Sequence, residues 1–222
     1  MALAGLFVLI ELFMLGCTVD KGDSSGESTG TSSSSSEGGS TSTSSSGDVP
    51  TSSSSGSSTG VVPAGCDVDF PRVRLETSMG DMVVMLDAVH VPITVANFIH
   101  YVEADFYAGT IFHRVIDGFV IQGGGFTPDG KEKPTDPPIP LEIAPGAAHV
   151  DGAIAMARTN EPDSATAQFY LCDGPQPGLD GNYAVFGVLV EGFEVLHAIS
   201  AVATDGNDTP TTDVVLLSVT CE

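Results

Sequence analysis

The sequence predicts a mainly β domain, a closed eight-stranded antiparallel barrel capped by two α-helices. Three observations support this prediction. Residues 66–222 contain about eight short runs of apolar and β-branched residues, the length and composition of strands. Gly, Pro and Asp separate these runs, as turn residues do between antiparallel strands. Two further segments have helical spacing and are expected to cover the open ends of the barrel.

The first half of the domain is expected to begin with a hairpin and a helix. Strands at 73–75 and 82–86 flank a turn at 78–81. The first helix is expected to start at Pro92, because proline is tolerated in the first helical turn. Apolar residues then recur at spacings of four, three and four, which indicates one buried face. They are Val95, Ile99, Val102 and Phe106.

Six more strands and a second helix are expected in the rest of the domain. The helix should span about 193–202. Residues 126–152 are rich in Pro and Gly and are expected to form a long surface loop rather than a second domain. The strand candidates are 111–116, 119–122, 153–157, 168–172, 184–190 and 214–220.

Composition divides the chain into three parts. Residues 1–17 are an apolar run that ends in Leu15-Gly16-Cys17, which resembles an export signal with a lipoprotein lipidation site at Cys17. The alternatives are an ordinary signal peptide, which would leave the protein secreted or periplasmic, and an uncleaved anchor. Residues 18–65 are almost wholly Ser, Thr, Gly and acidic residues, so they are expected to be a disordered tether. Residues 66–222 have the size of one domain.

Charge and cysteine usage limit the partners. The net charge is −22, and the six basic residues of the domain form no cluster, so nucleic acid is excluded as a partner. Cys66 and Cys221 bracket the domain, which favours a disulfide between them in an oxidising compartment. Cys172 follows apolar residues and is expected to be a buried free thiol. The cysteine spacings and dispersed histidines fit no metal site.

Two stretches, 112–124 and 167–170, place one arginine and two glutamines among apolar and aromatic residues. This set suits a reaction that needs neither a bond to the enzyme nor a proton transfer, such as rotation about an X-Pro peptide bond. Arg114 and Gln122 share a face of the hairpin only if its turn has three residues, 117–119. Asp117-Gly118 favours a two-residue turn instead, so the residues alone leave the register open.

Five segments in order over roughly 70–220 resemble the cyclophilin family of peptidyl-prolyl cis-trans isomerases, and two of them look like its bacterial branch. The resemblance implies an eight-stranded barrel with two capping helices and selects the three-residue turn. It also implies an isomerase, or rotamase, that acts on proline-containing polypeptides and needs no cofactor. The segments are Phe112-His113-Arg114-Val115-Ile116, the run 118–124, Met156-Ala157-Arg158, the run 164–169 and Val185-Phe186-Gly187.

The resemblance also implies roles by position. Arg114 corresponds to the catalytic arginine and Gln122 to the residue that orients it. Tyr170 stands where many members have phenylalanine, so its hydroxyl is expected to point outward or to find a partner. Gly178 stands where many members carry an aromatic residue. The proline pocket and its rim correspond to Phe119, Val120, Tyr170, Leu179 and Tyr183, and the adjoining peptide groove to Ala157, Arg158 and Gln168.

The sequence therefore predicts a monomeric isomerase, held at the bacterial cell envelope by its N-terminal lipid and acting on prolines of exported or unfolded proteins. A binding module is the alternative function. Such a module would keep the proline groove but would have lost useful turnover, and would serve as a chaperone displayed on the membrane tether.

Overall fold

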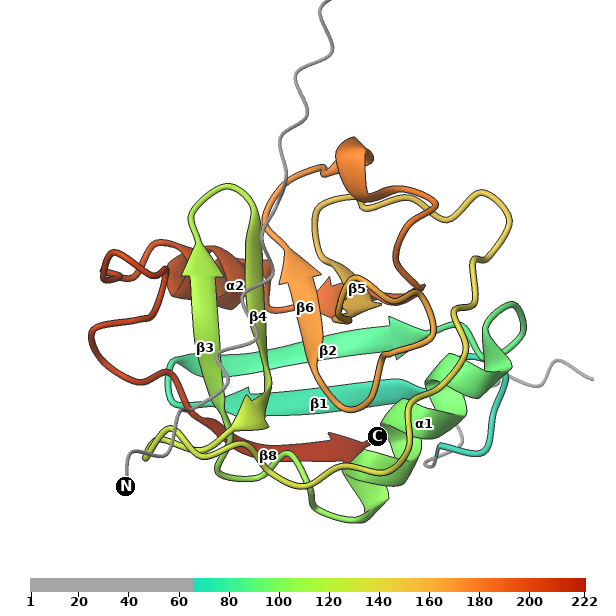
Figure 1. Ribbon diagram of the computed structural model, residues 1–222, viewed down its shortest axis with the longest axis horizontal. Helices are drawn as coiled ribbons and strands as arrows, with labels where there is room; N and C mark the ends of the chain where they lie inside the picture. Colours follow the sequence, from blue (N-terminus) through green and yellow to red (C-terminus); the bar gives the residue numbers. More distant parts are fainter. Residues whose placement is uncertain (1–65) are drawn as a thin grey trace, which may run out of the picture. The chain divides into compact units, whose positions relative to one another are not determined.

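The computed structural model describes residues 66–222. The predicted export signal (1–17), the tether (18–65) and the lipidation site at Cys17 lie outside the described residues. The described part forms one antiparallel sheet with two α-helices and a short 3-10 helix, η1 (Figure 1). Within this part, each helix is too short or too polar to cross a membrane.

The predicted order of strands and helices is confirmed, with ends that differ by a few residues. The helices are α1 (Pro92–Glu103), α2 (Phe193–Ser200) and η1 (Pro177–Leu179). The strand predicted to end at 122 continues to Phe126 through three glycines; a β-carbon on Gly123 would lie 2.9 Å from the Phe112 ring. The strands are β1 (Arg72–Thr77), β2 (Gly80–Leu86), β3 (Ile111–Ile116), β4 (Val120–Phe126), β5 (Ala153–Met156), β6 (Phe169–Cys172), β7 (Val185–Glu191) and β8 (Leu216–Cys221).

The prediction of a closed barrel is wrong, because the sheet is an open half-barrel that turns through 249°. Its strand order is β3-β4-β6-β5-β7-β2-β1-β8, which leaves β3 and β8 as edges. Among the described residues, an isolated bridge joins Ile111 to Val215, just before β8, and the Gly109 amide donates to the Leu216 carbonyl at 2.8 Å. Further along β3 the edge is covered by a loop instead, since the Val115 amide donates to the Asp208 carbonyl at 2.8 Å. These loop contacts satisfy backbone groups that a closing strand would otherwise satisfy.

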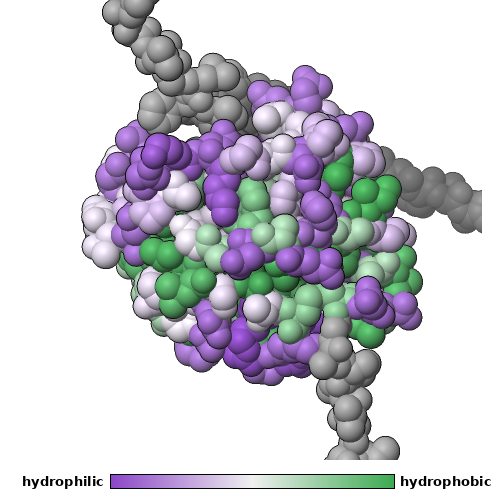
Figure 2. Space-filling model, turned by 90° about the horizontal axis from the view of Figure 1, so that it is seen from below, coloured by the Kyte–Doolittle hydropathy of each residue, from purple (hydrophilic) through white to green (hydrophobic). Residues whose placement is uncertain are grey.

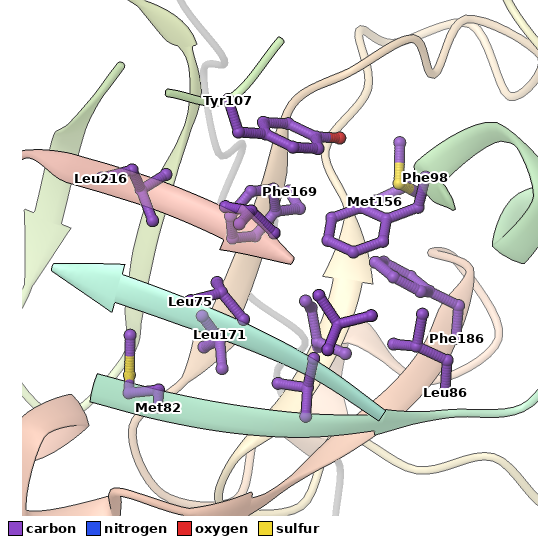
Figure 3. Packing of buried hydrophobic residues seen from close by; sticks show 14 of the residues in the cluster. Leu75, Met82, Leu86, Phe98, Tyr107, Met156, Phe169, Leu171, Phe186 and Leu216 are labelled. Carbon is purple, nitrogen blue, oxygen red and sulfur yellow. The ribbon is translucent and has the colours of Figure 1, made fainter. Parts of the chain in front are cut away.

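The core lies inside the curved sheet and is closed at one end by α1 (Figures 1 and 3). Phe98 of α1 is fully buried, with its ring centroid 5.6 Å from that of Phe169 and 5.1 Å from that of Phe186. The predicted helix face is partly wrong. Val95 and Val102 are buried, but Ile99 and Phe106 are only partly buried, because the inward stripe is centred on Phe98.

A disulfide joins Cys66, ahead of β1, to Cys221 at the end of β8, with their Cα atoms 5.6 Å apart. It fixes the first described residue to the sheet. Cys172 is buried and is the free cysteine of the described part. On the face seen from below in Figure 1, hydrophilic and hydrophobic residues are interspersed (Figure 2).

Candidate active site

A row of four residues crosses the outer face of the sheet. Arg114 on β3 is opposite Gln122 on β4, Gln122 is opposite Tyr170 on β6, and Tyr170 is opposite Ala155 on β5. Successive side chains along a strand point to opposite faces. The next row belongs to the core, so the Arg114 row faces away from it. The members of that core row are Val115, Ile121, Leu171 and Ile154.

The turn between β3 and β4 brings Arg114 and Gln122 onto one face. Ile116 pairs with Val120, so the loop has the three residues that the family resemblance implies. Contacts from outside the hairpin stabilise this loop against the two-residue alternative. The Gly118 amide donates to Asp173 Oδ2 at 2.9 Å, and the Gln176 side chain donates to the Gly118 carbonyl at 3.0 Å. Gly118 has φ +67°, a conformation that favours glycine.

A second apolar cluster, separate from the main core, lies beside the row. It unites all five residues assigned by resemblance to the proline pocket and its rim, together with Ala157 of the groove. Fully formed apolar surfaces of this kind bind apolar ligand groups such as a pyrrolidine ring. We call it the outer cluster. Its buried members are Val120, Ala153, Ala155, Ala157, Tyr170 and Cys172, and Phe119, Leu179, Tyr183 and Val185 pack against them.

Arg114 and Gln122 have different bonding partners. The Arg114 side chain is 26% exposed, and its Nε lies 3.4 Å from Asp208 Oδ2. The buried Gln122 amide donates to Gln168 Oε1 at 3.1 Å, and Gln168 in turn donates to Glu132 at 3.4 Å. Sequence reasoning missed Asp208, because it lies in a polar loop far along the chain and nothing in its local pattern links it to Arg114.

Arg158 braces the rim of the outer cluster. Its guanidinium carbon lies 4.6 Å from the centroid of the Tyr183 ring, within the range of a cation–π contact. Its Nε and Nη2 donate to the Asn182 carbonyl at 3.0 and 2.8 Å, and Nη1 donates to the Thr159 carbonyl at 2.8 Å. These bonds connect Tyr183 with the neighbouring loops at the rim of the outer cluster.

The hydroxyl of Tyr170 has a partner, as expected from the sequence. It lies 2.9 Å from His149 Nε2, and His149 Nδ1 lies 2.8 Å from Asp180 Oδ1. Burial raises the pKa of Tyr170 well above its ordinary value. His149 falls in the segment predicted as a surface loop, yet it is buried, so that prediction is wrong at this residue. The β-carbon position of Gly178 has open space around it.

His113 is adjacent to Arg114 but does not share its face. It lies at an irregularity in the β3–β4 register, and its ring contacts that of Phe126 edge-on with centroids 4.7 Å apart. Its Nδ1 is buried without a hydrogen-bond partner among the described residues. Burial, and to a smaller extent the Arg114 charge, lower the pKa of His113 to about 4. The ring is therefore neutral at pH 7 and belongs to the packing of the sheet.

One group of described residues brings potential metal ligands together, and it lies outside the outer cluster. Ligand atoms of Asp151, Asp173 and His197 lie within 4.8 Å of one another. Each residue already has a hydrogen-bond role. His197 Nδ1 is 2.6 Å from Asp173 Oδ1, and Asp151 Oδ1 accepts the Gly174 amide at 2.8 Å. These bonds account for the positions of the three side chains.

Comparisons with known proteins agree on one family. Residues 72–221 match the family model described as cyclophilin type peptidyl-prolyl cis-trans isomerase/CLD. The chain is 46% identical over 154 residues to peptidyl-prolyl cis-trans isomerase A of Dickeya dadantii, covering 67% of this chain and 81% of that protein. It is 42% identical over 160 residues to peptidyl-prolyl cis-trans isomerase B of Escherichia coli, covering 67% and 98%.

A solved structure gives the same result for the fold. The crystal structure of a cyclophilin type peptidyl-prolyl cis-trans isomerase from Cryptosporidium parvum superposes with a TM-score of 0.62 at 28% identity. The match covers 69% of this chain and 98% of that one. It therefore spans nearly the whole of that isomerase.

Proposed function

This chain belongs to the cyclophilin family and is a peptidyl-prolyl cis-trans isomerase, and from that premise we propose that Arg114 is its catalytic residue and the outer cluster its proline-binding surface. One observation supports this assignment above the others. The strand register puts Arg114 in the same outward row as Tyr170, a buried member of the outer cluster. A cation and an apolar surface thus share one face of the sheet.

The reaction requires weakening of peptide resonance. Resonance sets a rotation barrier of about 18–20 kcal/mol, while the cis and trans forms of X-Pro differ by only about 0.5–1 kcal/mol. In the twisted transition state the prolyl nitrogen becomes pyramidal and gains a lone pair that can accept a hydrogen bond. A guanidinium that donates to this nitrogen binds the transition state more strongly than either ground state. Arg114 suits this role because arginine stays charged and presents several fixed donors.

The outer cluster supplies the second requirement, a fixed end for the rotation. An apolar surface made by Phe119, Val120 and Leu179 around Tyr170 holds the pyrrolidine ring while the acyl side turns. Exclusion of water there strengthens the contact with Arg114. Moving spontaneous exchange from about 10–100 s to milliseconds requires about 5–6 kcal/mol. One charged donor and an apolar surface that holds the pyrrolidine ring account for an energy of that size.

Substitution of Arg114 tests the mechanism. In a protease-coupled assay with a proline peptide, Arg114→Ala should lower kcat/KM by about 100-fold or more while the circular dichroism spectrum is retained. The matched control is Arg74→Ala, which removes another arginine whose partners are Asp81 and Glu222. Arg74→Ala should keep its activity. An Arg114→Ala variant as active as the parent would exclude Arg114 from catalysis.

We also propose that the enzyme acts on exported proteins at the bacterial cell envelope, anchored through Cys17. Two observations support this location. The apolar run 1–17 ends in a cysteine, and Cys66 and Cys221 form a disulfide, a bond typical of oxidising compartments. Prolines in unfolded exported chains would then be the substrates.

A further inference from the structure

The Tyr170 hydroxyl lies in an otherwise apolar cluster and has one partner there. A hydroxyl without a hydrogen bond in such surroundings costs roughly 1–3 kcal/mol. Tyr170 avoids this cost because its hydroxyl is 2.9 Å from His149 Nε2. The His149 side chain is 0% exposed, so water cannot replace either partner without a rearrangement. The planes of the two rings are within 10° of parallel, and their centroids are 6.0 Å apart.

Asp180 fixes the direction of this bond. Its Oδ1 is 2.8 Å from His149 Nδ1 and also accepts the His149 backbone amide at 2.8 Å. Both bonds lower the pKa of Asp180, which keeps it an ionised carboxylate that can only accept. Nδ1 of His149 therefore carries a proton, and in the neutral imidazole Nε2 is the acceptor. It follows that Tyr170 donates its O–H to His149.

The same histidine connects two parts of the outer cluster. Asp180 directly follows η1, whose last residue, Leu179, packs against the cluster. The Gln176 amide, at the start of η1, donates to the His149 carbonyl at 2.7 Å. Through Tyr170, Asp180 and Gln176, His149 fixes η1 relative to β6. These are the elements that carry Leu179 and Tyr170.

We propose that His149 is a positioning residue for proline binding. It holds the Tyr170 hydroxyl in a hydrogen bond on the far side from the substrate, so that the tyrosine presents only its ring to the proline. This inference rests on the proposed function of the outer cluster. Without His149, the Tyr170 hydroxyl would form its hydrogen bond within the pocket. The bound pyrrolidine ring would then contact a polar, hydrated group.

A double-mutant cycle on steady-state isomerase kinetics of the full chain tests this role. In the parent, His149→Leu should raise KM for a proline peptide five- to tenfold while kcat stays within twofold. In the Tyr170→Phe background, the same substitution should change KM by less than twofold, because no hydroxyl remains to be released. His149→Gln retains an acceptor, so its KM should lie close to that of the parent rather than that of His149→Leu. This pattern is expected if His149 affects proline binding through the Tyr170 hydroxyl.

Two controls separate positioning from general damage. His100 also pairs with an aspartate, Asp136 at 2.9 Å, but on the exposed surface, so His100→Leu should leave KM unchanged. If His149→Leu does not fold, the KM of the His149→Leu/Tyr170→Phe double variant is compared with that of Tyr170→Phe. The double variant should fold, because the Asp180 side chain is 37% exposed and water can bind its carboxylate.

Three results would overturn the inference. They are an unchanged KM in His149→Leu, an equal rise of KM in both backgrounds, and a double variant with KM more than fivefold above that of Tyr170→Phe. A failure of the proposed function can be told apart from these results. In that case Arg114→Ala would keep the kcat of the parent, whatever the KM values of the His149 variants.

Discussion

Arg114 and Gln122 are directly opposite each other on β3 and β4, yet each side chain bonds to a different residue. Arg114 Nε lies 3.4 Å from Asp208, and Gln122 donates to Gln168. The guanidinium is thus held from the loop that covers the β3 edge, while the Gln122 amide bonds to Gln168 on the other side. Before substrate binds, the position of Arg114 depends on that loop.

Asp208→Asn should lower kcat/KM two- to fivefold. The Asp208 side chain is 44% exposed, and an ion pair of this kind contributes about 0–1 kcal/mol. Asparagine tolerates the left-handed backbone at this position, where φ is +62°, so the loop should persist. The measurement is the coupled peptide assay, with the exposed Asp213→Asn as a matched control that keeps its activity. Equal activities in the two variants would show that Asp208 does not position Arg114.

His113 should make the fold less stable in mild acid. Its pKa is about 4 in the folded protein and about 6.5 in the unfolded chain, so between these values the unfolded chain binds more protons. The free energy of unfolding should therefore fall as pH decreases from 6.5 to 4, by about 3 kcal/mol from this residue. Denaturant titrations at pH 7 and 4.5 measure it, and His113→Phe should show a smaller difference. The same difference in both proteins would contradict the assignment.

Reduction of the Cys66–Cys221 disulfide should destabilise the domain. The bond joins residues 155 apart in sequence, and the loss of chain entropy in the unfolded state predicts a contribution of up to about 5 kcal/mol. Thermal unfolding with and without dithiothreitol measures this contribution. A Cys66→Ser/Cys221→Ser variant should unfold like the reduced parent and should not respond to dithiothreitol. A reductant effect that persists in this variant would point to another cause.

Cys17→Ser should release the protein from membranes. If Cys17 is lipidated, its removal eliminates the acyl chains that hold the protein at a bilayer. Fractionation of cells into membrane and soluble parts, followed by immunoblotting, measures the distribution. Membrane association that is unchanged in the variant would refute lipidation at Cys17.

The length of the turn between β3 and β4 could not be predicted from the local sequence. The residue pattern located both strands, but Asp117-Gly118 favours a two-residue turn. The three-residue turn is stabilised by Asp173 and Gln176, which approach from a different part of the chain. Family resemblance selected the correct register because it carries such contacts implicitly. Spacing alone does not contain them.

The opening of the sheet and the burial of His149 also could not be predicted from short segments of sequence. Short strands and turn residues predict eight antiparallel strands, but they do not show whether the first and last edges meet. In this protein the loop around Asp208 covers the β3 edge instead. His149 lies in a segment rich in Pro and Gly, and nothing near it in sequence indicates burial. Its partners are Tyr170 and Asp180, which folding brings to its two ring nitrogens.

By itself, the sequence determined the order of strands and helices, which follows from the side-chain periodicity and the turn residues of short segments. The residues of the candidate site were assigned through the family resemblance. Only the tertiary structure decided the turn register, the opening of the sheet and the partners of Arg114 and Tyr170. Each of these depends on hydrogen bonds between polar groups far apart in the chain, whose distances are set only when the whole domain has packed.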